Sequence, residues 1–164
     1  FRALVEAGAD VERPFKDLLG NAETAIFFAV EAKDVPLVKL LIAKGAKVNV
    51  ESGGVTNRSP LGIAVLAGDA PMVKVLLDAG SDPKSTLTSP AGATPTAWLA
   101  VATGNLEIVK MVVEKGADVN LAASLLVPAK GGGTEIQQTT PLKLAIDKKS
   151  GAIEQYLRSK GAAR

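Results

Sequence analysis

The sequence predicts an all-α fold: a solenoid of stacked helix pairs that forms a single domain over residues 1–164. One observation is an opening motif that recurs every 35 to 45 residues, a period typical of solenoid repeats. A second is a glycine that follows each opening at a constant distance. A third is the run of apolar residues at helical spacing between the opening and the glycine. The openings are at Thr24, Ser59, Pro95 and Thr140, and the glycines are Gly45, Gly80, Gly116 and Gly161.

A short first helix is expected at each opening. The hydroxyls of Ser59 and Thr140 can cap its N-terminus, and a proline such as Pro60 fits its first turn because the missing N–H would be unpaired there. The third opening is expected to be irregular, because Thr94 and Pro95 repeat the motif one residue early. A longer second helix then ends at the glycine, which supplies a left-handed residue. The second helices are expected around residues 37–41, 72–77 and 108–113.

These features resemble the ankyrin repeat, in which a tight turn leads into a short helix, a longer helix and a hairpin loop. The resemblance spans nearly the whole chain. Residues 1–20 look like a partial leading repeat ending in Gly8-Ala9-Asp10-Val11, and the repeat that starts near residue 140 looks like a C-terminal cap. Its second helix carries Glu154, Arg158 and Ser159, and such polar residues suit the end of a stack. The resemblance implies helix-turn-helix units joined by long hairpin loops.

One departure from the family pattern concerns the histidine of the opening motif, which is absent from every repeat. The residues in its place are Phe27, Gly62, Trp98 and Lys143. The hydrogen bonds that this histidine makes to the turns are therefore not expected here. Trp98 has two interpretations, packing between repeats or contact with a ligand.

The chain has no histidine and no cysteine. This removes the commonest general base, thiol nucleophiles and zinc sites with nitrogen or sulfur ligands. Residues 131–133 are glycines, but no Lys-Ser/Thr pair follows them as in a phosphate-binding loop, so we interpret them as a flexible joint. We expect no enzymatic activity, no cofactor and no metal.

Charge and hydropathy bound the remaining classes. The net charge is only +2 and no basic stripe is present, which argues against nucleic-acid binding. Lys39, Lys74 and Lys110 fall at equivalent repeat positions and form either a solvated outer face or a patch for an acidic partner. No apolar run approaches the roughly 18 residues of a membrane span, so we expect a soluble chain in the cytoplasm or a bacterial periplasm. Phe1 lies inside an expected helix, and we expect upstream residues to be missing.

The loops between repeats are longer than the family pattern requires. Residues 51–58 and 85–92 form turn-rich fingers, and the longest insertion covers residues 122–138. It carries an apolar quartet that begins with Leu125 and Leu126. Exposed apolar residues in a loop reduce solubility unless they are covered. Three interpretations remain open: the loop binds a partner, packs on the stack or is disordered.

The ankyrin resemblance also implies a concave groove formed by the hairpin tips and the outward side of the first helices. Leu66 is notable there because it has no evident core role; the alternative is that it covers the neighbouring finger. With Trp98 and the long loop included, the candidate partner-binding residues are Asn21, Glu23, Glu31, Val55, Thr56, Arg58, Leu66, Thr94, Trp98, Thr103, Leu125, Leu126, Ile136, Gln137, Thr139, Asp147 and Lys148.

We therefore expect a monomeric, non-enzymatic module that binds another folded protein through this groove and the extended loops. A sharper hypothesis is an inhibitor or self-protection (immunity) protein of bacterial type, whose longest loop covers the cleft of a partner enzyme. The alternatives are a passive scaffold or adaptor and, more remotely, an enzyme with a carboxylate or lysine site.

Overall fold

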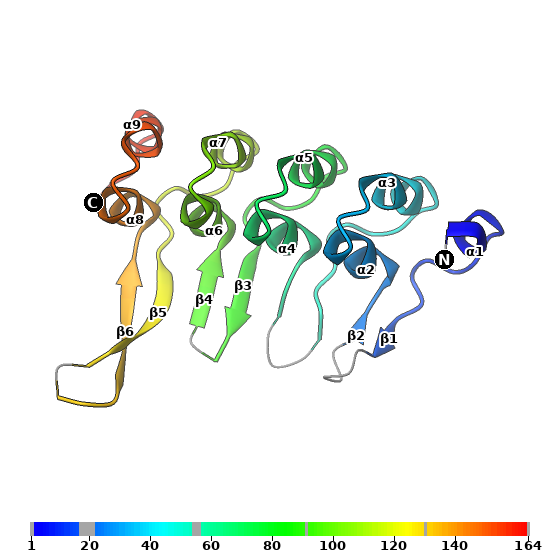
Figure 1. The fold of residues 1–164 in the computed structure, drawn as a ribbon, viewed down its shortest axis with the longest axis horizontal. Coiled ribbons are helices and arrows are strands. Elements are labelled where there is room, and N and C mark those ends of the chain that lie inside the picture. Colours follow the sequence, from blue (N-terminus) through cyan, green and yellow to red (C-terminus); the bar gives the residue numbers. More distant parts are fainter. Residues whose placement is uncertain (1, 17–21, 54–56, 91, 130, 164) are drawn as a thin grey trace.

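The computed structural model describes residues 2–16, 22–53, 57–90, 92–129 and 131–163. Two parallel rows of helices form an elongated stack, and hairpins project from the row of first helices (Figure 1). The first helices are α2 (Ala25–Glu31), α4 (Pro60–Leu66), α6 (Thr96–Thr103) and α8 (Pro141–Asp147). The second helices are α1 (Arg2–Glu6), α3 (Val35–Ala43), α5 (Ala70–Asp78), α7 (Leu106–Glu114) and α9 (Gly151–Ser159). The predicted solenoid of helix pairs is confirmed.

The expectation of an all-α fold was too narrow, because the long loops pair as antiparallel strands. The strands are β1 (Phe15–Lys16), β2 (Ala22–Glu23), β3 (Thr86–Ser89), β4 (Gly92–Pro95), β5 (Ala123–Pro128) and β6 (Thr134–Thr139). They pair as β1–β2, β3–β4 and β5–β6. These loops are long enough for their backbone N–H and C=O groups to form hydrogen bonds with each other across a strand pair. The described residues of these loops thus belong to regular secondary structure.

Capping explains where the helices begin. The Ser59 hydroxyl accepts a hydrogen bond from the Gly62 N–H at 3.0 Å, and the Thr140 hydroxyl accepts one from the Lys143 N–H at 3.2 Å. Thr24 makes no such bond. The third opening is irregular as predicted: Pro95 is the N-cap of α6, and the Thr96 hydroxyl instead donates to the Ser85 carbonyl at 2.6 Å.

Each predicted closing glycine has a positive φ, from 83° to 109°. The turn between the two helices of a repeat also needs a left-handed residue, and the repeats fill it differently. Gly68 and Gly104 hold this position in the second and third full repeats, whereas Lys33 and Lys149, with φ of 55° and 56°, hold it in the first and fourth. A lysine in this conformation is strained, because its Cβ approaches the following carbonyl oxygen.

The core is continuous along the stack. Alanines separate neighbouring first helices, and Ala29, Ala64, Ala100 and Ala145 are at most 1% exposed. Leucine or valine fills the equivalent site of each second helix, and Leu41, Leu76, Val112 and Leu157 are all fully buried. No helix pair could bury this surface alone, so the stability of the fold comes from stacking.

The hairpins lie against one another as well as against the helices. Asn57 and Thr88 exchange two backbone hydrogen bonds of 3.0 Å, which join the finger of residues 51–58 to β3. The β3–β4 hairpin lies beside β5. Gly92 allows this approach, because a Cβ at that position would lie only 2.5 Å from the Cβ of Ser124. The hairpins therefore form a ledge along the row of first helices.

Candidate functional site

The surface between this ledge and the outward side of the first helices holds most of the predicted contact residues. We call it the inner surface and define it by the residues just before each first helix and by the last residues of that helix. The residues that the structure describes there are Glu23, Glu31, Arg58, Leu66, Thr94, Thr103, Thr139, Asp147 and Lys148. Asn21, Val55 and Thr56 lie outside the described residues.

Three of the predicted contact residues form an ionic cluster across the joint between the first two full repeats. The Arg58 guanidinium lies 2.6 Å from the Glu23 carboxylate and 3.0 Å from that of Glu31. Glu23 is 3% exposed, so its charge is removed from water and depends on Arg58. Glu23 is thus buried in the chain, and its contact with a partner stays a prediction. Glu31, 42% exposed at its side chain, remains accessible.

Exposed apolar side chains lie on α2 and α4, the two helices that this cluster links. Leu66, at the end of α4, is 58% exposed, and Phe28 on α2 is 60% exposed. Phe28 meets Phe15 of β1 edge to face, with ring centroids 5.6 Å apart. Leu66 is thus displayed, as predicted. Phe15 and Phe28 were missed, although Phe28 is an aromatic residue where the other repeats carry Ile63, Leu99 and Leu144.

Toward the C-terminus the inner surface is more polar, and its side chains make hydrogen bonds and ion pairs within the chain. The Thr103 hydroxyl donates to the Ala100 carbonyl at 2.7 Å, and Asp147 pairs with Lys143 at 2.8 Å. The Lys148 ammonium donates to the Ala102 carbonyl and so links α8 to α6. Thr139 is only 6% exposed, and its contact with a partner stays a prediction.

Trp98 and Thr94 are both half-buried. Trp98 packs against the core, as the packing interpretation requires. Its indole Nε1 is buried without a hydrogen-bond partner among the described residues. The second interpretation, ligand contact, stays a prediction.

The long insertion forms an ordered hairpin with two different faces. Ala123 is buried and Leu125 and Val127 are half-buried, whereas Leu126 and Ile136 are 51% and 62% exposed. Leu126 and Ile136 lie directly opposite each other in the register. One face therefore packs inward, as the packing interpretation requires, and the other is displayed; that the loop binds a partner stays a prediction. Gln137, opposite Leu125, is exposed.

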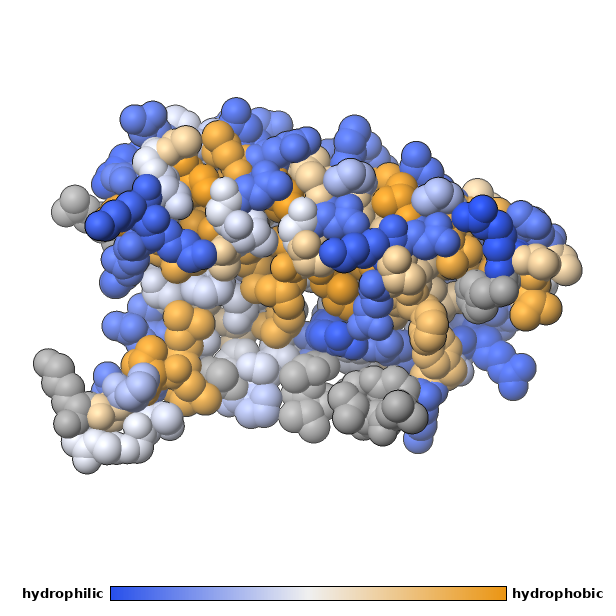
Figure 2. All heavy atoms as spheres, viewed as in Figure 1, coloured by the Kyte–Doolittle hydropathy of each residue, from blue (hydrophilic) through white to orange (hydrophobic). Residues whose placement is uncertain are grey.

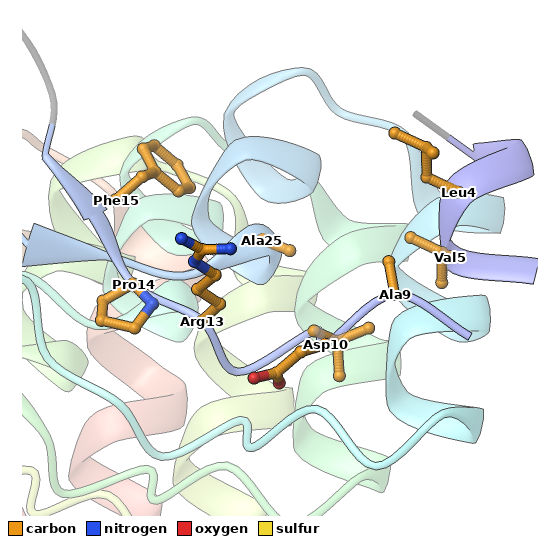
Figure 3. Close-up of a pocket in the computed structure, with 9 residues that line it drawn as sticks. Leu4, Val5, Ala9, Asp10, Arg13, Pro14, Phe15 and Ala25 are labelled. Atoms are coloured by element: carbon orange, nitrogen blue, oxygen red, sulfur yellow. The ribbon is translucent and has the colours of Figure 1, made fainter. Parts of the chain in front are cut away.

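An apolar pocket of about 220 Å³ lies between α1, the following turn and α2, and Phe15 of the Phe15–Phe28 pair is part of its lining (Figure 3). Leu4 lines it and is 63% exposed, although its equivalents in the other second helices are fully buried. No first helix packs beneath α1 in the described chain. The pocket is smaller than typical small-molecule sites of about 300–1,000 Å³.

Among the described residues, one carboxylate and one phenolic hydroxyl have shifted pKa values, and both belong to second helices. Hydrogen bonds from Lys74 and then Lys115 lower the pKa of Asp78. Burial, with the nearby Glu114, raises the pKa of Tyr156. Among the described residues no group of three acidic side chains could hold a metal ion. The described helices also include none long and apolar enough to cross a membrane.

The comparison with known proteins agrees with the repeat architecture of the structure. A family model of ankyrin repeats, in three copies, matches residues 1–86 and 26–123. Palmitoyltransferase ZDHHC13 of Homo sapiens is 42% identical over 82 residues, which are 50% of this chain and 12% of that protein. Putative palmitoyltransferase ZDHHC13 of Danio rerio is 32% identical over 147 residues, 90% of this chain and 20% of that protein. Palmitoyltransferase ZDHHC17 of Homo sapiens is 40% identical over 82 residues. The chain thus spans a fifth or less of the length of these relatives.

Proposed function

Because this chain belongs to the ankyrin repeat family, whose repeats bind other proteins, we propose that it recognises a partner protein through its inner surface and acts without catalysis of its own. The observation that carries the proposal is Leu66, a leucine 58% exposed on a rigid helix. At the same repeat position the neighbouring repeats carry Glu31, Ala102 and Asp147. This position has the same location in every repeat, but its side chain differs from one repeat to the next. Such a position is suited to selecting a partner.

The surroundings of Leu66 support this reading. Large apolar side chains that become buried on association dominate binding energy, while the polar rim sets orientation and association rate. Leu66 and the Phe15–Phe28 pair supply the apolar part, and Glu31 and Arg58 supply charge between them. Because Glu23 and Glu31 already hold Arg58, little side-chain entropy is lost when a partner docks beside it.

The relatives are named as palmitoyltransferases, and this chain matches only 12% to 20% of their length. We therefore propose that the chain contributes recognition, as a monomer, and that any transferase activity belongs to other parts of such proteins. An immunity protein of bacterial type has no support among these relatives, which are vertebrate proteins.

An inhibitory role is a second candidate, favoured by the β5–β6 hairpin. This hairpin reaches further from the helices than the others (Figure 1), and apolar side chains gather over it (Figure 2). A projecting arm of this kind can enter or cover a partner's cleft. Deleting residues 124–137 should then abolish inhibition of the partner but leave helical circular dichroism nearly unchanged. A large loss of thermal stability would show that the hairpin instead covers the core.

The inner surface is tested by Leu66→Asp. The immobilised chain is used to capture proteins from an extract of the source cells, with quantification by mass spectrometry. The matched control is Leu121→Asp, because Leu121 is also exposed, 44%, but belongs neither to the inner surface nor to the Phe15–Phe28 pair. We expect the control to retain the captured partner and Leu66→Asp to lose it by about tenfold or more, since a hot-spot loss is about 2 kcal/mol. Equal capture by all three chains would overturn the proposal.

A further inference from the structure

The repeat position of Leu66 forms a regular row along the inner surface. It holds Glu31, Leu66, Ala102 and Asp147 in the four full repeats, each in the last turn of a first helix. The helices of the first three members pack as neighbours, α2 against α4 and α4 against α6. Because packed helices lie about 8–10 Å apart, successive members of the row have about that spacing. We call these four positions the exit row.

The first member of the exit row carries a surplus negative charge. Glu23 and Glu31 share a single guanidinium, that of Arg58, so this cluster has one carboxylate more than it has cations. Glu23 is buried and is the closer of the two to Arg58, at 2.6 Å against 3.0 Å for Glu31. Among the described residues Glu31 has no ion pair besides Arg58, and its side chain is 42% exposed. The surplus charge therefore resides at Glu31, where a partner can reach it.

The third member carries a positive charge, although its own residue is an alanine. The Lys148 ammonium donates to the Ala102 carbonyl in the last turn of α6, where the helix dipole favours a cation. This carbonyl has no formal charge, and Lys148 makes no ion pair with a carboxylate of the described chain. Lys148 is exposed. Its charge is thus held at the end of α6 without a counter-charge.

The two remaining members complete the pattern. Leu66, between the two charged sites, is apolar and 58% exposed. Asp147 pairs with Lys143 at 2.8 Å, so the fourth member adds no net charge. Along α2, α4 and α6 the exit row therefore runs from a negative site through an apolar site to a positive site.

We propose that the exit row binds a segment of the partner protein that places a basic residue at Glu31, an apolar residue at Leu66 and an acidic residue at Lys148. The inference rests on the proposed function, because it specifies the chemistry of the partner at the same surface. The order of the three residues follows from charge complementarity, since like charges brought together across an interface disfavour a partner. The segment can run in either chain direction.

The spacing of the exit row indicates the conformation of the bound segment. A polyproline II helix has three residues per turn and rises about 3.1 Å per residue, so every third side chain points to the same side at intervals of about 9 Å. That interval matches neighbouring helices of the stack. Side chains on one face of a β-strand are only about 6.6 Å apart. We therefore expect the basic, apolar and acidic residues at every third position of the segment.

The test uses random displayed peptides of about ten residues, which are long enough for two such intervals. Peptides selected on the wild-type chain should carry the basic, apolar and acidic residues in this order or its reverse, three residues apart. Their affinities are then measured on Glu31→Gln and Lys148→Gln, each of which removes one charge and keeps a polar side chain. We expect binding to weaken about threefold to tenfold on each variant, since docking removes these ion pairs partly from water.

The matched controls are Glu107→Gln and Lys39→Gln. They make the same changes of charge at exposed positions of the second helices α7 and α3, which are not part of the inner surface. Binding to these controls should stay within about twofold of the wild-type chain, because salt screens distant surface charges. Enriched peptides without the ordered charges, or equal affinities for the charge variants and the controls, would overturn the inference.

Two further measurements do not depend on the folding of these charge variants. On the wild-type chain, raising the salt concentration from about 0.05 M to about 0.5 M should weaken the selected peptides at least about threefold, because it shortens the range of the charge interactions. A separate selection on Glu31→Lys should enrich an acidic residue in place of the basic one. Affinity that does not change with salt, or a basic residue that persists on Glu31→Lys, would contradict the proposed charge order.

The Leu66→Asp variant separates this inference from the proposed function. Peptides that lose binding to Leu66→Asp but bind both charge variants normally would refute the charge order and leave the inner surface as the binding site. Peptides that bind Leu66→Asp as tightly as the wild-type chain would count against both. A selection that enriches no peptide would overturn the inference alone, since capture of the partner by Leu66→Asp still tests the proposed function.

Discussion

Among the exposed and half-buried residues of the inner surface, Arg58 should be the one whose replacement destabilises the chain most. Its loss leaves the Glu23 carboxylate buried without its counter-charge. Removing one partner of a buried ion pair typically costs about 3–5 kcal/mol. The Arg58 side chain is 28% exposed, so water can replace part of its charge and we expect about 2–3 kcal/mol for Arg58→Met. The pair with Glu31, whose side chain is 42% exposed, should contribute less than about 1 kcal/mol.

The assay is urea unfolding followed by circular dichroism and by fluorescence of Trp98, the only tryptophan. Coincident transitions are required, because repeat stacks can lose cooperativity. A loss of about 2–3 kcal/mol corresponds to roughly 4–12 °C in melting temperature for a chain of this size. The double variant Glu23→Leu/Arg58→Met should recover most of the loss, since an apolar pair can replace a buried ion pair. A loss below about 0.5 kcal/mol for Arg58→Met, or a double variant no better than the single one, would refute the reasoning.

Three further predictions concern the stack itself. Lys33→Gly should raise the free energy of unfolding by about 0.5–1 kcal/mol, because glycine adopts a φ of 55° without strain. At the equivalent site of the next repeat, Gly68→Ala should lower the free energy of unfolding by about 1–2 kcal/mol. Melting curves equal to that of the wild-type chain would contradict this prediction. Leu76→Ala should cost about 2–5 kcal/mol and Leu4→Ala less than about 1 kcal/mol, because Leu76 is fully buried and Leu4 is 63% exposed; similar losses in urea would show that Leu4 is covered in solution. Asp78→Asn should lower the melting temperature at neutral pH, because hydrogen bonds from the lysines hold the pKa of Asp78 below its unfolded value; the difference should disappear as the pH falls through that lowered pKa, and a pH-independent difference would argue against it.

Much of the inner surface could be placed from the sequence because repeat positions translate into positions in space. Leu66 is the example: its offset from Ser59 predicted an exposed place at the end of a first helix, and it is exposed. Glu23 shows the limit of this reasoning. Its offset predicted the same surface, but whether a carboxylate there is displayed or buried depends on what the next repeat places opposite it. Here that residue is Arg58, 35 residues away.

The sequence by itself determined the period of the repeat, the two helices of each unit and the glycine that ends the second helix, because these follow from residues a few positions apart. The tertiary structure alone decided which loops pair as strands, which face of the β5–β6 hairpin is displayed and why Glu23 is buried while Glu31 is accessible. Those outcomes depend on strand register and on neighbours from other repeats. A local pattern contains no information about either.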